Sequence, residues 1–314
     1  MILRREELKR TARAPAKLNL FLELLGRRED GFHELETVMV PIRLADTVSF
    51  LPFLPNGENQ ANETRLDVRT CWPIHSQIAT AAIPTGPENI IVRALEVLRQ
   101  RTGCELGAQV ELVKRVPAAA GLGGGSSDAA AALALANRGW KINWPVERLA
   151  EVAAEVGSDV PFFLSRGAAI CRGRGERIER LPSMSPVHFV VVKPLDGLST
   201  AEVYRTHAES LEGKSGKSLS SDQLNGLTTG LIRGSAQEIC RWMRNRLQVA
   251  ASLLSPWVEE LRMAFDQLDF VGHQLSGSGT AYFGVCRHAQ HARRLANILR
   301  TRQLGLVYAT RSCQ

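Results

Sequence analysis

The 314-residue sequence lacks the features of secreted, membrane-anchored or metal-scaffolded proteins. Its six cysteines are scattered, and no two of them form a C-x-x-C pair. This argues against a zinc site and against a disulfide framework, and it favours a reducing, cytoplasmic location. No uncharged apolar run reaches the roughly 18 residues of a membrane span, and no apolar core follows the basic residues near the start. We therefore expect no membrane partner, no signal peptide and no bound structural metal.

The chain also lacks a concentrated basic patch in its sequence, although 39 Lys and Arg residues against 32 Asp and Glu residues give a net charge of +7. The densest basic stretch, residues 166–180, is interrupted by Glu176 and Glu179. No zinc-finger spacing and no aromatic-plus-basic strand signature accompanies it. A dispersed basic excess suits an enzyme that handles small polyanions at least as well, so we expect no nucleic-acid partner.

The hydrophobic patterning indicates an α+β fold, because strands and helices intermingle without the regular rhythm of a doubly wound sheet. The length agrees with two domains, and a change in composition near 180–187 favours a division into residues 1–183 and 184–314. A Ser-, Lys- and Gly-rich stretch, 208–223, predicts a mobile surface loop. The predicted strands are 14–25, 37–42, 47–51, 108–113, 187–192 and 306–310. The predicted helices are 89–100, 127–137, 146–156, 236–250, 256–267 and 288–300.

The most informative segment is Pro117–Ala132, which reads P-A-A-A-G-L-G-G-G-S-S-D-A-A-A-A. Its clustered glycines let the backbone adopt positive φ angles and approach a ligand closely. Successive N–H groups and the N-terminus of the alanine-rich helix that follows then form a phosphate site. Ser126 or Ser127 would cap the helix, contact phosphate or hold Mg²⁺. The segment is neither a P-loop, since no Lys follows the glycines, nor a Rossmann fingerprint. A linker or sharp turn is the alternative, although a linker would not run directly into a helix.

This segment resembles the second motif of the GHMP kinase superfamily, which is named for galactokinase, homoserine kinase, mevalonate kinase and phosphomevalonate kinase. The superfamily's first and third motifs correspond to A-P-A-K-L-N-L at 14–20 and L-S-G-S-G-T-A at 275–281. The pairing of K-L-N-L with D-G-F-H at 30–33 is most similar to the branch that acts on 4-diphosphocytidyl-2-C-methyl-D-erythritol in the non-mevalonate isoprenoid route. The resemblance is close over about residues 12–200, except that it is weak between 51 and 87, and it is weak again between 205 and 270.

The resemblance implies a two-domain α+β fold, with an N-terminal ATP-binding domain and a C-terminal ferredoxin-like α/β sandwich. It implies transfer of the γ-phosphate of ATP to the 2-hydroxyl of a small-molecule substrate carrying cytidine diphosphate, with Mg²⁺ accompanying ATP. The alternatives are a superfamily kinase for homoserine or a mevalonate-like acid, and a catalytically silent nucleotide-binding regulator. Retention of Lys17 and Asp159 argues against the silent protein, and the turn at 31–33 argues against homoserine.

The matching positions imply that Lys17 and Asp159 are the catalytic pair. Asp159 would take the proton of the acceptor hydroxyl, and Lys17 would lower its pKa and stabilise charge on the hydroxyl and γ-phosphate. Taken alone, Asp159 precedes an apolar, strand-like run and could simply cap a helix, and Lys17 could be a solvated strand-edge residue. However, Lys17 and Asn19 share one face of an otherwise apolar strand, which favours a cleft.

The resemblance also implies binding roles. Phe32 would stack on the cytosine, His33 would read the base edge, and Tyr204 would close the other side, although simple packing would explain an aromatic at a turn. The family more often has Tyr where this chain has Phe32. Core packing is equally open for Ile90, and an ordinary turn for Gly277 and Ser278. The implied ATP-binding residues are Asn89, Ile90, Lys114, Pro117, Ala118, Ala119, Ala120, Gly121, Leu122, Gly123, Gly124, Gly125, Ser126 and Ser127. The implied substrate-binding residues are Asn19, Phe32, His33, Tyr204, Gly277 and Ser278.

Overall fold

A computed structural model describes residues 8–29, 31–53, 64–73, 83–210 and 221–313. The chain forms two compact units, each of them discontinuous along the sequence. The first unit comprises residues 1–16, 45–116 and 123–165, and the second comprises 17–44, 117–122 and 166–314. Strands β1 (Arg10–Arg27) and β2 (His33–Pro52) contribute residues to both units. The sequence instead favours a single division between residues 183 and 184, with each domain continuous along the chain. That boundary stays a prediction.

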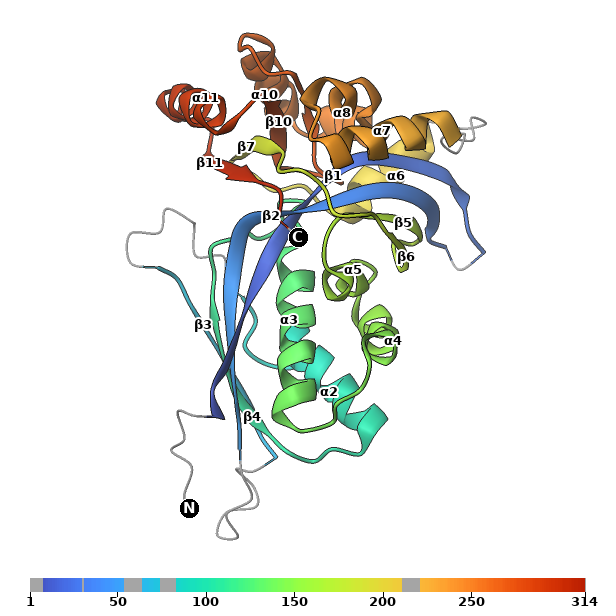
Figure 1. Cartoon of the computed structure of the whole chain (residues 1–314), viewed down its shortest axis with the longest axis vertical. Helices are drawn as coiled ribbons and strands as arrows, with labels where there is room; N and C mark the ends of the chain where they lie inside the picture. Colours follow the sequence, from blue (N-terminus) through green and yellow to red (C-terminus); the bar gives the residue numbers. More distant parts are fainter. Residues whose placement is uncertain (1–7, 30, 54–63, 74–82, 211–220, 314) are drawn as a thin grey trace. The chain divides into compact units, whose positions relative to one another are not determined.

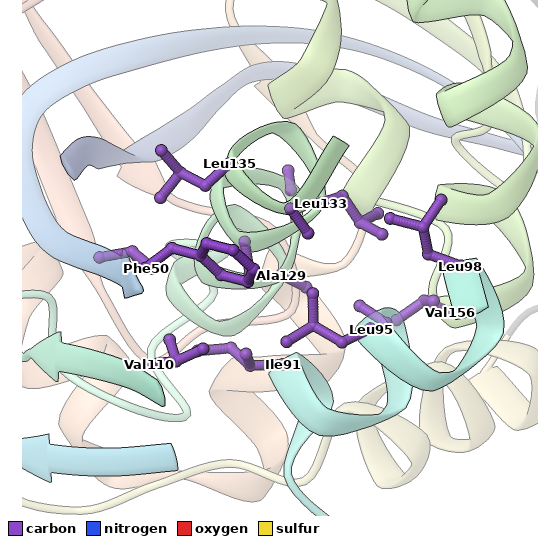
Figure 2. Close-up of a cluster of buried hydrophobic side chains, with 14 of the residues drawn as sticks. Phe50, Ile91, Leu95, Leu98, Val110, Ala129, Leu133, Leu135 and Val156 are labelled. Carbon is purple, nitrogen blue, oxygen red and sulfur yellow. The ribbon is translucent and has the colours of Figure 1, made fainter. Parts of the chain in front are cut away.

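In the first unit, three helices cover strands β3 (Leu66–Cys71) and β4 (Ala108–Val113). They are α2 (Ile90–Thr102), α3 (Gly124–Gly139) and α4 (Val146–Val156), and the short α5 (Val160–Ser165) follows them. β4 pairs in parallel with β3 and antiparallel with residues 47–52 of β2. Figure 2 shows the core between these layers, in which Phe50, Ile91, Leu95, Val110 and Leu133 interdigitate.

Local signals explain where these helices begin and end. The Asn89 side chain accepts a hydrogen bond from the Ile91 N–H at 2.8 Å and so caps α2, which satisfies one of the free donors of its first turn. Gly103 ends the helix at φ 69°, in the left-handed region that glycine adopts without strain. The predicted helix at 89–100 is confirmed, as are the helix at 146–156 and the strand at 108–113.

The second unit contains a four-stranded antiparallel sheet in the order β11–β7–β10–β9. Its strands are β7 (His188–Lys193), β9 (Gly272–Leu275), β10 (Tyr282–Cys286) and β11 (Leu306–Arg311). Helices α10 (Pro256–Asp266) and α11 (Ala289–Thr301) pack on this sheet, which agrees with the α/β sandwich expected from the sequence (Figure 1). Their buried residues Phe265, Leu295 and Leu299 join Val190 and Tyr282 in one core.

The remaining elements of the second unit lie along β1 and β2. Residues 35–39 of β2 pair with β5 (Ala169–Gly173), which pairs with β6 (Arg177–Arg180). β1 pairs in parallel with the two-residue strand β8 (Arg244–Asn245). The other helices are α6 (Thr200–Ser210), α7 (Ser221–Arg233), α8 (Ala236–Trp242) and α9 (Gln248–Leu254). No helix in the described part of the chain is long and apolar enough to span a membrane.

Four of the predicted elements are wrong in detail. The strands predicted at 37–42 and 47–51 are one continuous β2, because residues 43–46 between them stay extended. The helix predicted at 236–250 is interrupted where β8 pairs with β1, which yields α8 and α9. The run after Asp159 is helix α5 rather than a strand. Of the predicted loop at 208–223, its first and last residues belong to α6 and α7, and 211–220 lie outside the described residues.

Candidate active site

Lys17 and Asn19 lie close together on β1, and both are buried, with exposed fractions of 5% and 2%. Lys17 Nζ donates a hydrogen bond to Asn19 Oδ1 at 2.5 Å. Asn19 Nδ2 donates in turn to Thr37 Oγ1 at 2.8 Å, and that hydroxyl donates to the Phe21 carbonyl at 2.6 Å. The chain of hydrogen bonds fixes the ammonium group in place. Lys17 is therefore not the solvated strand-edge residue that the sequence left open.

The glycine turn between β9 and β10 lies directly against this pair. A Cβ added to Gly277 would stand 3.1 Å from Asn19 Oδ1 and 3.4 Å from Lys17 Nζ. Gly277 also has φ +60°, so both its space and its backbone conformation favour glycine. Ser276 Oγ accepts the Asn19 N–H at 3.4 Å, which ties the turn to β1.

Residues 117–122, the first part of the glycine-rich segment, pack against the same turn. The Ala281 N–H donates to the Ala120 carbonyl at 3.0 Å, and the Lys17 N–H donates to the Leu122 carbonyl at 2.9 Å. A Cβ on Gly121 would stand only 2.2 Å from the Ser276 carbonyl oxygen. Three segments that are far apart in the sequence thus meet around one buried cation, as expected for parts of a single site.

Two side chains that the sequence analysis missed hold this arrangement. Asn245 Nδ2, from β8, donates to the carbonyls of Leu275 and Gly277 at 2.9 and 2.8 Å. Thr200 Oγ1 and Ser278 Oγ share a hydrogen bond of 2.9 Å. Asn245 and Thr200 lie in no recognisable motif, so no sequence signal points to them; only the fold brings them to the turn.

The structure brings two of the three predicted cytosine-binding residues together. His33 and Tyr204 have ring centroids 5.3 Å apart, with their planes tilted by 41°. Phe32 is 54% exposed, and the Arg174 guanidinium lies 4.9 Å from the centre of its ring. Desolvation, followed by the charge of Arg27, lowers the pKa of His33, so its neutral form is favoured near pH 7. A neutral imidazole offers one donor and one acceptor to a base edge.

In the first unit, the glycine-rich segment continues into α3. Gly123 has φ +68° and α3 begins at Gly124, three residues before the predicted start. The Ser127 N–H is taken by the Gly123 carbonyl at 2.9 Å, which leaves the N–H groups of the first turn directed outward from the helix end. Ser127 Oγ is buried and has no hydrogen-bond partner among the described residues. A bare helix end beside an unsatisfied buried hydroxyl fits the phosphates of a nucleotide.

Beneath this helix end lies a buried ionic trio, Lys114, Asp46 and Asp128. Lys114 Nζ pairs with Asp128 Oδ2 at 2.9 Å and with Asp46 Oδ2 at 2.5 Å. Asp46 Oδ1 also accepts the N–H groups of Arg115 and Val116, the latter at 2.8 Å. A Cβ on Gly124 would stand 3.4 Å from Lys114 Nζ, so the trio directly supports the start of α3.

Burial and neighbouring charges shift the pKa values of Lys114 and Asp128. Desolvation acts to lower the pKa of Lys114, but the carboxylates of Asp128 and Asp46 outweigh it and raise that pKa. For Asp128, burial raises the pKa well above its usual value, the Lys114 ammonium opposes this, and the Asp46 carboxylate adds to it. The Lys114 ammonium is therefore held in its charged form, while Asp128 gives up its proton less readily than an exposed carboxyl group does.

Asn89 and Ile90 lie beside the same segment. Asn89 uses both polar atoms of its side chain within the protein, since Nδ2 donates to the Pro84 carbonyl at 2.6 Å while Oδ1 caps α2. Ile90 is partly buried, and a Cβ on Gly125 would stand 3.7 Å from Ile90 Cγ2. Ile90 thus lies against the glycine-rich helix start, where an apolar side chain suits the flat face of a base.

Asp159 lies in the turn between α4 and α5 and is half-buried. The Val160 N–H donates to the Gly157 carbonyl at 3.2 Å, which closes this turn. The carboxylate is placed at a helix start, and the capping role that the sequence left open stays possible in that position. The described residues hold no group of three His, Cys, Asp or Glu side chains placed to bind a metal ion.

Comparison with known proteins identifies the relatives of this chain. The family model for the GHMP kinases N terminal domain matches residues 89–167, and the model for the GHMP kinases C terminal domain matches residues 227–304. A 4-diphosphocytidyl-2-C-methyl-D-erythritol kinase of Pelotomaculum thermopropionicum is 39% identical over 286 residues, which cover 91% of this chain and 92% of the relative. The enzyme of the same name from Bacillus subtilis is 32% identical over 288 residues, 92% of each chain.

Solved structures agree with these sequence relatives. The crystal structure of a 4-(cytidine 5'-diphospho)-2C-methyl-D-erythritol kinase aligns with a TM-score of 0.73 and 32% identity, covering 97% of this chain and 100% of that one. A homoserine kinase from Cytophaga hutchinsonii aligns with a TM-score of 0.69 but only 18% identity, over 99% of this chain and 96% of that one. The second likeness shows a shared fold alone.

Proposed function

The chain belongs to the 4-diphosphocytidyl-2-C-methyl-D-erythritol kinase family, and on that premise we propose that it transfers the γ-phosphate of ATP to the 2-hydroxyl of that substrate. The products are ADP and the 2-phosphate, in the non-mevalonate route to isoprenoid precursors. The single observation in the structure that carries this function is the buried Lys17–Asn19 pair enclosed by two glycine turns. Such a fixed cation suits a reaction in which negative charge develops on transferred phosphate.

We propose that Asp159 takes the proton from the acceptor hydroxyl while Lys17 stabilises the charge on that oxygen and on the γ-phosphate. Phosphoryl transfer needs little covalent chemistry from the protein, so positioning and charge stabilisation account for most of the rate. The proposal requires Lys17 and Asp159 to act on one acceptor oxygen. The variants Lys17→Met and Asp159→Asn should then each lose activity. In the double variant, the loss of transition-state stabilisation should differ from the sum of the two single losses.

The N–H groups at the start of α3, in residues 123–127, are proposed to bind the ATP phosphates. The supporting observations are the bare first turn and the unsatisfied Ser127 hydroxyl. Mg²⁺ is proposed to accompany ATP and to neutralise the developing phosphate charge. Ser127 Oγ and Ser126 are the candidate protein contacts to it. Ile90 would contact the adenine, and Asn89 and Lys114 would hold the nucleotide pocket in shape through their internal partners. The six scattered cysteines support a reducing cytoplasm as the place of action.

The acceptor is proposed to bind through its cytosine, with Phe32 and Tyr204 on the ring faces and His33 at the base edge. The contact between His33 and Tyr204 and the exposure of the Phe32 ring support this role. Gly277, Ser278 and Asn19 would face the erythritol portion, because their turn adjoins the Lys17 ammonium.

An ADP-release assay over a panel of acceptors tests the function directly. The panel holds 4-diphosphocytidyl-2-C-methyl-D-erythritol, methylerythritol 4-phosphate, homoserine and mevalonate. Turnover should require the cytidine-bearing acceptor, and transfer at equal rates to an acceptor without cytidine would overturn the assignment. No turnover with any acceptor, despite ATP binding, would favour a nucleotide-binding regulator.

Changing Phe32 tests the cytosine contact. Phe32→Ala should raise the KM for the acceptor by roughly five- to a hundred-fold, because stacking on one aromatic contributes about 1–3 kcal/mol per base. The KM for ATP should stay nearly constant, since the cytosine is remote from the reacting hydroxyl of the acceptor. Phe32→Tyr is the matched control and should be nearly silent, because it preserves the ring. An unchanged acceptor KM in Phe32→Ala would show that the ring does not bind the base.

A further inference from the structure

A basic hollow lies between α11 and β11, the red helix and strand near the C-terminal end of the chain in Figure 1. It has a volume of about 570 Å³ and is lined by Arg43, His188, Arg293, Arg300 and Arg311. No Asp or Glu side chain lines it. We use the name basic hollow for the space that these five side chains line. None of them belongs to the candidate active site.

Two of these arginines have no acidic partner in the described part of the chain. No carboxylate there pairs with Arg293 or Arg311, whereas Arg294, the next residue on α11, pairs with Asp269 at 2.6 Å. The fold therefore neutralises the outer face of α11 and leaves the face toward the hollow cationic. Like charges held close together repel one another, so an anion at this place would relieve an unfavourable interaction.

The fold holds one arginine side chain of the hollow in place and fixes the backbone position of a second. Arg300 donates to Asn297 Oδ1 at 2.7 Å and to the Val307 carbonyl at 3.2 Å, which holds its guanidinium at the wall. Arg311 closes the β11 ladder, where it pairs in register with His188 of β7. Prearranged side chains lose little conformational entropy when a ligand binds, which favours affinity.

The pKa of His188 reflects the positive charge around the hollow. Its pKa is lowered first by desolvation and then by the charges of Arg311, His288 and Arg293. Arginines from the helix and from the strand thus both act on this imidazole, which lines the hollow with them.

The rest of the lining indicates what kind of anion fits. Ala289, Ala292 and Ala309 leave the space open, and Leu44 and Val307 add apolar surface to it. The volume falls within the range of small-molecule sites, about 300–1,000 Å³. Guanidinium groups match the paired oxygens of phosphate groups, and several of them suit two linked phosphates better than one.

We propose that the basic hollow binds a small diphosphate, free or carried by a short apolar group, at a site separate from the kinase site. Arg293 and Arg311 contact the phosphate oxygens, Arg300 and Arg43 complete the cationic wall, and the alanines and Val307 accommodate the apolar group. This ligand site is additional to the kinase activity and does not depend on it.

Isothermal titration of the whole protein with inorganic diphosphate, with n-pentyl diphosphate and with orthophosphate tests the site. Saturating ADP is present throughout, so that the nucleotide site is filled. One equivalent of each diphosphate should bind, more tightly than orthophosphate and more weakly as salt is added. Tighter binding of n-pentyl diphosphate would identify the organic ligand, and equal binding would identify free diphosphate.

A double variant, Arg293→Gln with Arg311→Gln, should weaken diphosphate binding at least about tenfold, since hydrogen bonds to charged groups are individually strong. The matched control is Arg180→Gln with Arg233→Gln, which removes two exposed charges away from the hollow and should bind diphosphate as the unaltered protein does. If the double variant fails to fold, the exposed helical residue alone, in Arg293→Gln, should still weaken binding about threefold. Absence of diphosphate binding in the unaltered protein, or equal affinity in the double variant and its control, would overturn the proposal.

Discussion

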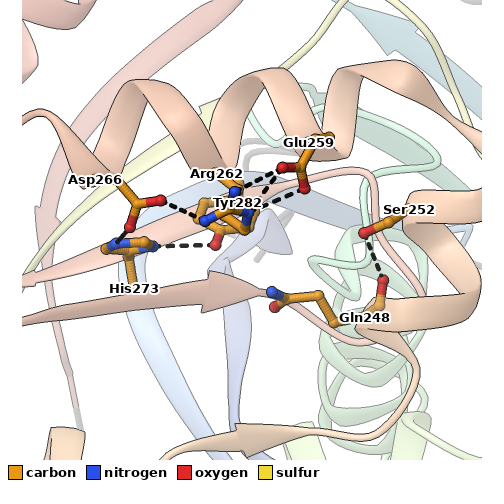
Figure 3. A network of polar contacts seen from close by, with 7 residues as sticks. All are labelled: Gln248, Ser252, Glu259, Arg262, Asp266, His273 and Tyr282. Atoms are coloured by element: carbon orange, nitrogen blue, oxygen red, sulfur yellow. Dashed lines mark hydrogen bonds and ion pairs between the residues drawn. The ribbon is translucent and has the colours of Figure 1, made fainter.

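Two charged clusters of the molecule contain similar groups and stand in opposite surroundings. The trio of Lys114, Asp46 and Asp128 in the first unit is 0–5% exposed. The cluster around Arg262 in the second unit, shown in Figure 3, has side chains that are 42–47% exposed at Arg262, Glu259 and Asp266. Both contain one cationic side chain between two acidic side chains.

The two clusters differ in how strongly solvent screens their charges. Around Arg262, solvent screens every pair, so the ion pairs contribute little to stability even though Arg262 forks onto Glu259 at 2.6 Å and also pairs with Asp266. The trio is buried, so solvent screens its charges little, and removal of the Lys114 ammonium leaves the buried carboxyl groups without a cation. The trio also supports the start of α3, where ATP is proposed to bind, whereas the Arg262 cluster lies on α10, away from any proposed ligand contact.

The largest effect should follow from Lys114→Met. The substitution keeps the length of the side chain and leaves the buried carboxyl groups of Asp46 and Asp128 without their cationic partner, so the free energy of unfolding should fall by about 3–5 kcal/mol. The KM for ATP should rise as well, because Gly124 and the first turn of α3 rest on this ammonium. Urea denaturation and ADP-release kinetics measure the two effects.

The matched control is Lys9→Met, which removes the exposed pair between Lys9 and Glu111 and should change neither quantity appreciably. If Lys114→Met were as stable as Lys9→Met, the distinction between buried and exposed clusters would fail.

A smaller effect, with a distinctive pH dependence, is expected for Asp128→Asn. The raised pKa of Asp128 means that the native state holds a proton which the unfolded chain releases above about pH 4. This group's contribution to stability is therefore greatest below its ordinary pKa and falls as the pH rises toward the raised native pKa. The Asn variant should lose that slope and should cost little at neutral pH, since Asp46 still pairs with Lys114.

Urea midpoints between pH 4 and pH 8 measure this difference, with Asp67→Asn, at a partly exposed carboxyl group paired with Arg69, as the control. Equal losses of stability in Asp128→Asn and in Lys114→Met at every pH would show that Asp128 is an ordinary ionised partner.

The smallest effect is expected for Arg262→Gln. Its pairs with Glu259 and Asp266 are exposed to solvent and screened by salt, so the denaturation midpoint at 150 mM salt should not change measurably. His273, which bonds to Tyr282 Oη at 3.0 Å and to Asp266 at 3.1 Å, keeps its buried partner in the variant. A clear loss of stability would show that solvent screens this cluster less than its exposure indicates.

The sequence predicted those features whose signals are local. The helix at 89–100, the alternation that places Lys17 with Asn19, and the glycines that run into α3 are each encoded within a few residues. Asp46 could not be assigned in this way, because its partner Lys114 lies far along the chain and nothing near Asp46 marks it as part of a trio. Asn245 was likewise hidden within a helical pattern that breaks only because β1 offers a free edge to β8.

The central claim is that this chain is a kinase whose acceptor proton is taken by Asp159, and turnover of the Asp159→Asn variant tests it most directly. The substitution keeps the shape of the side chain and removes the proton acceptor. In a steady-state assay with 4-diphosphocytidyl-2-C-methyl-D-erythritol, kcat should fall by about 10²-fold or more, while the Kd of ATP measured by calorimetry should stay nearly unchanged. Near-normal turnover in this variant would contradict the account.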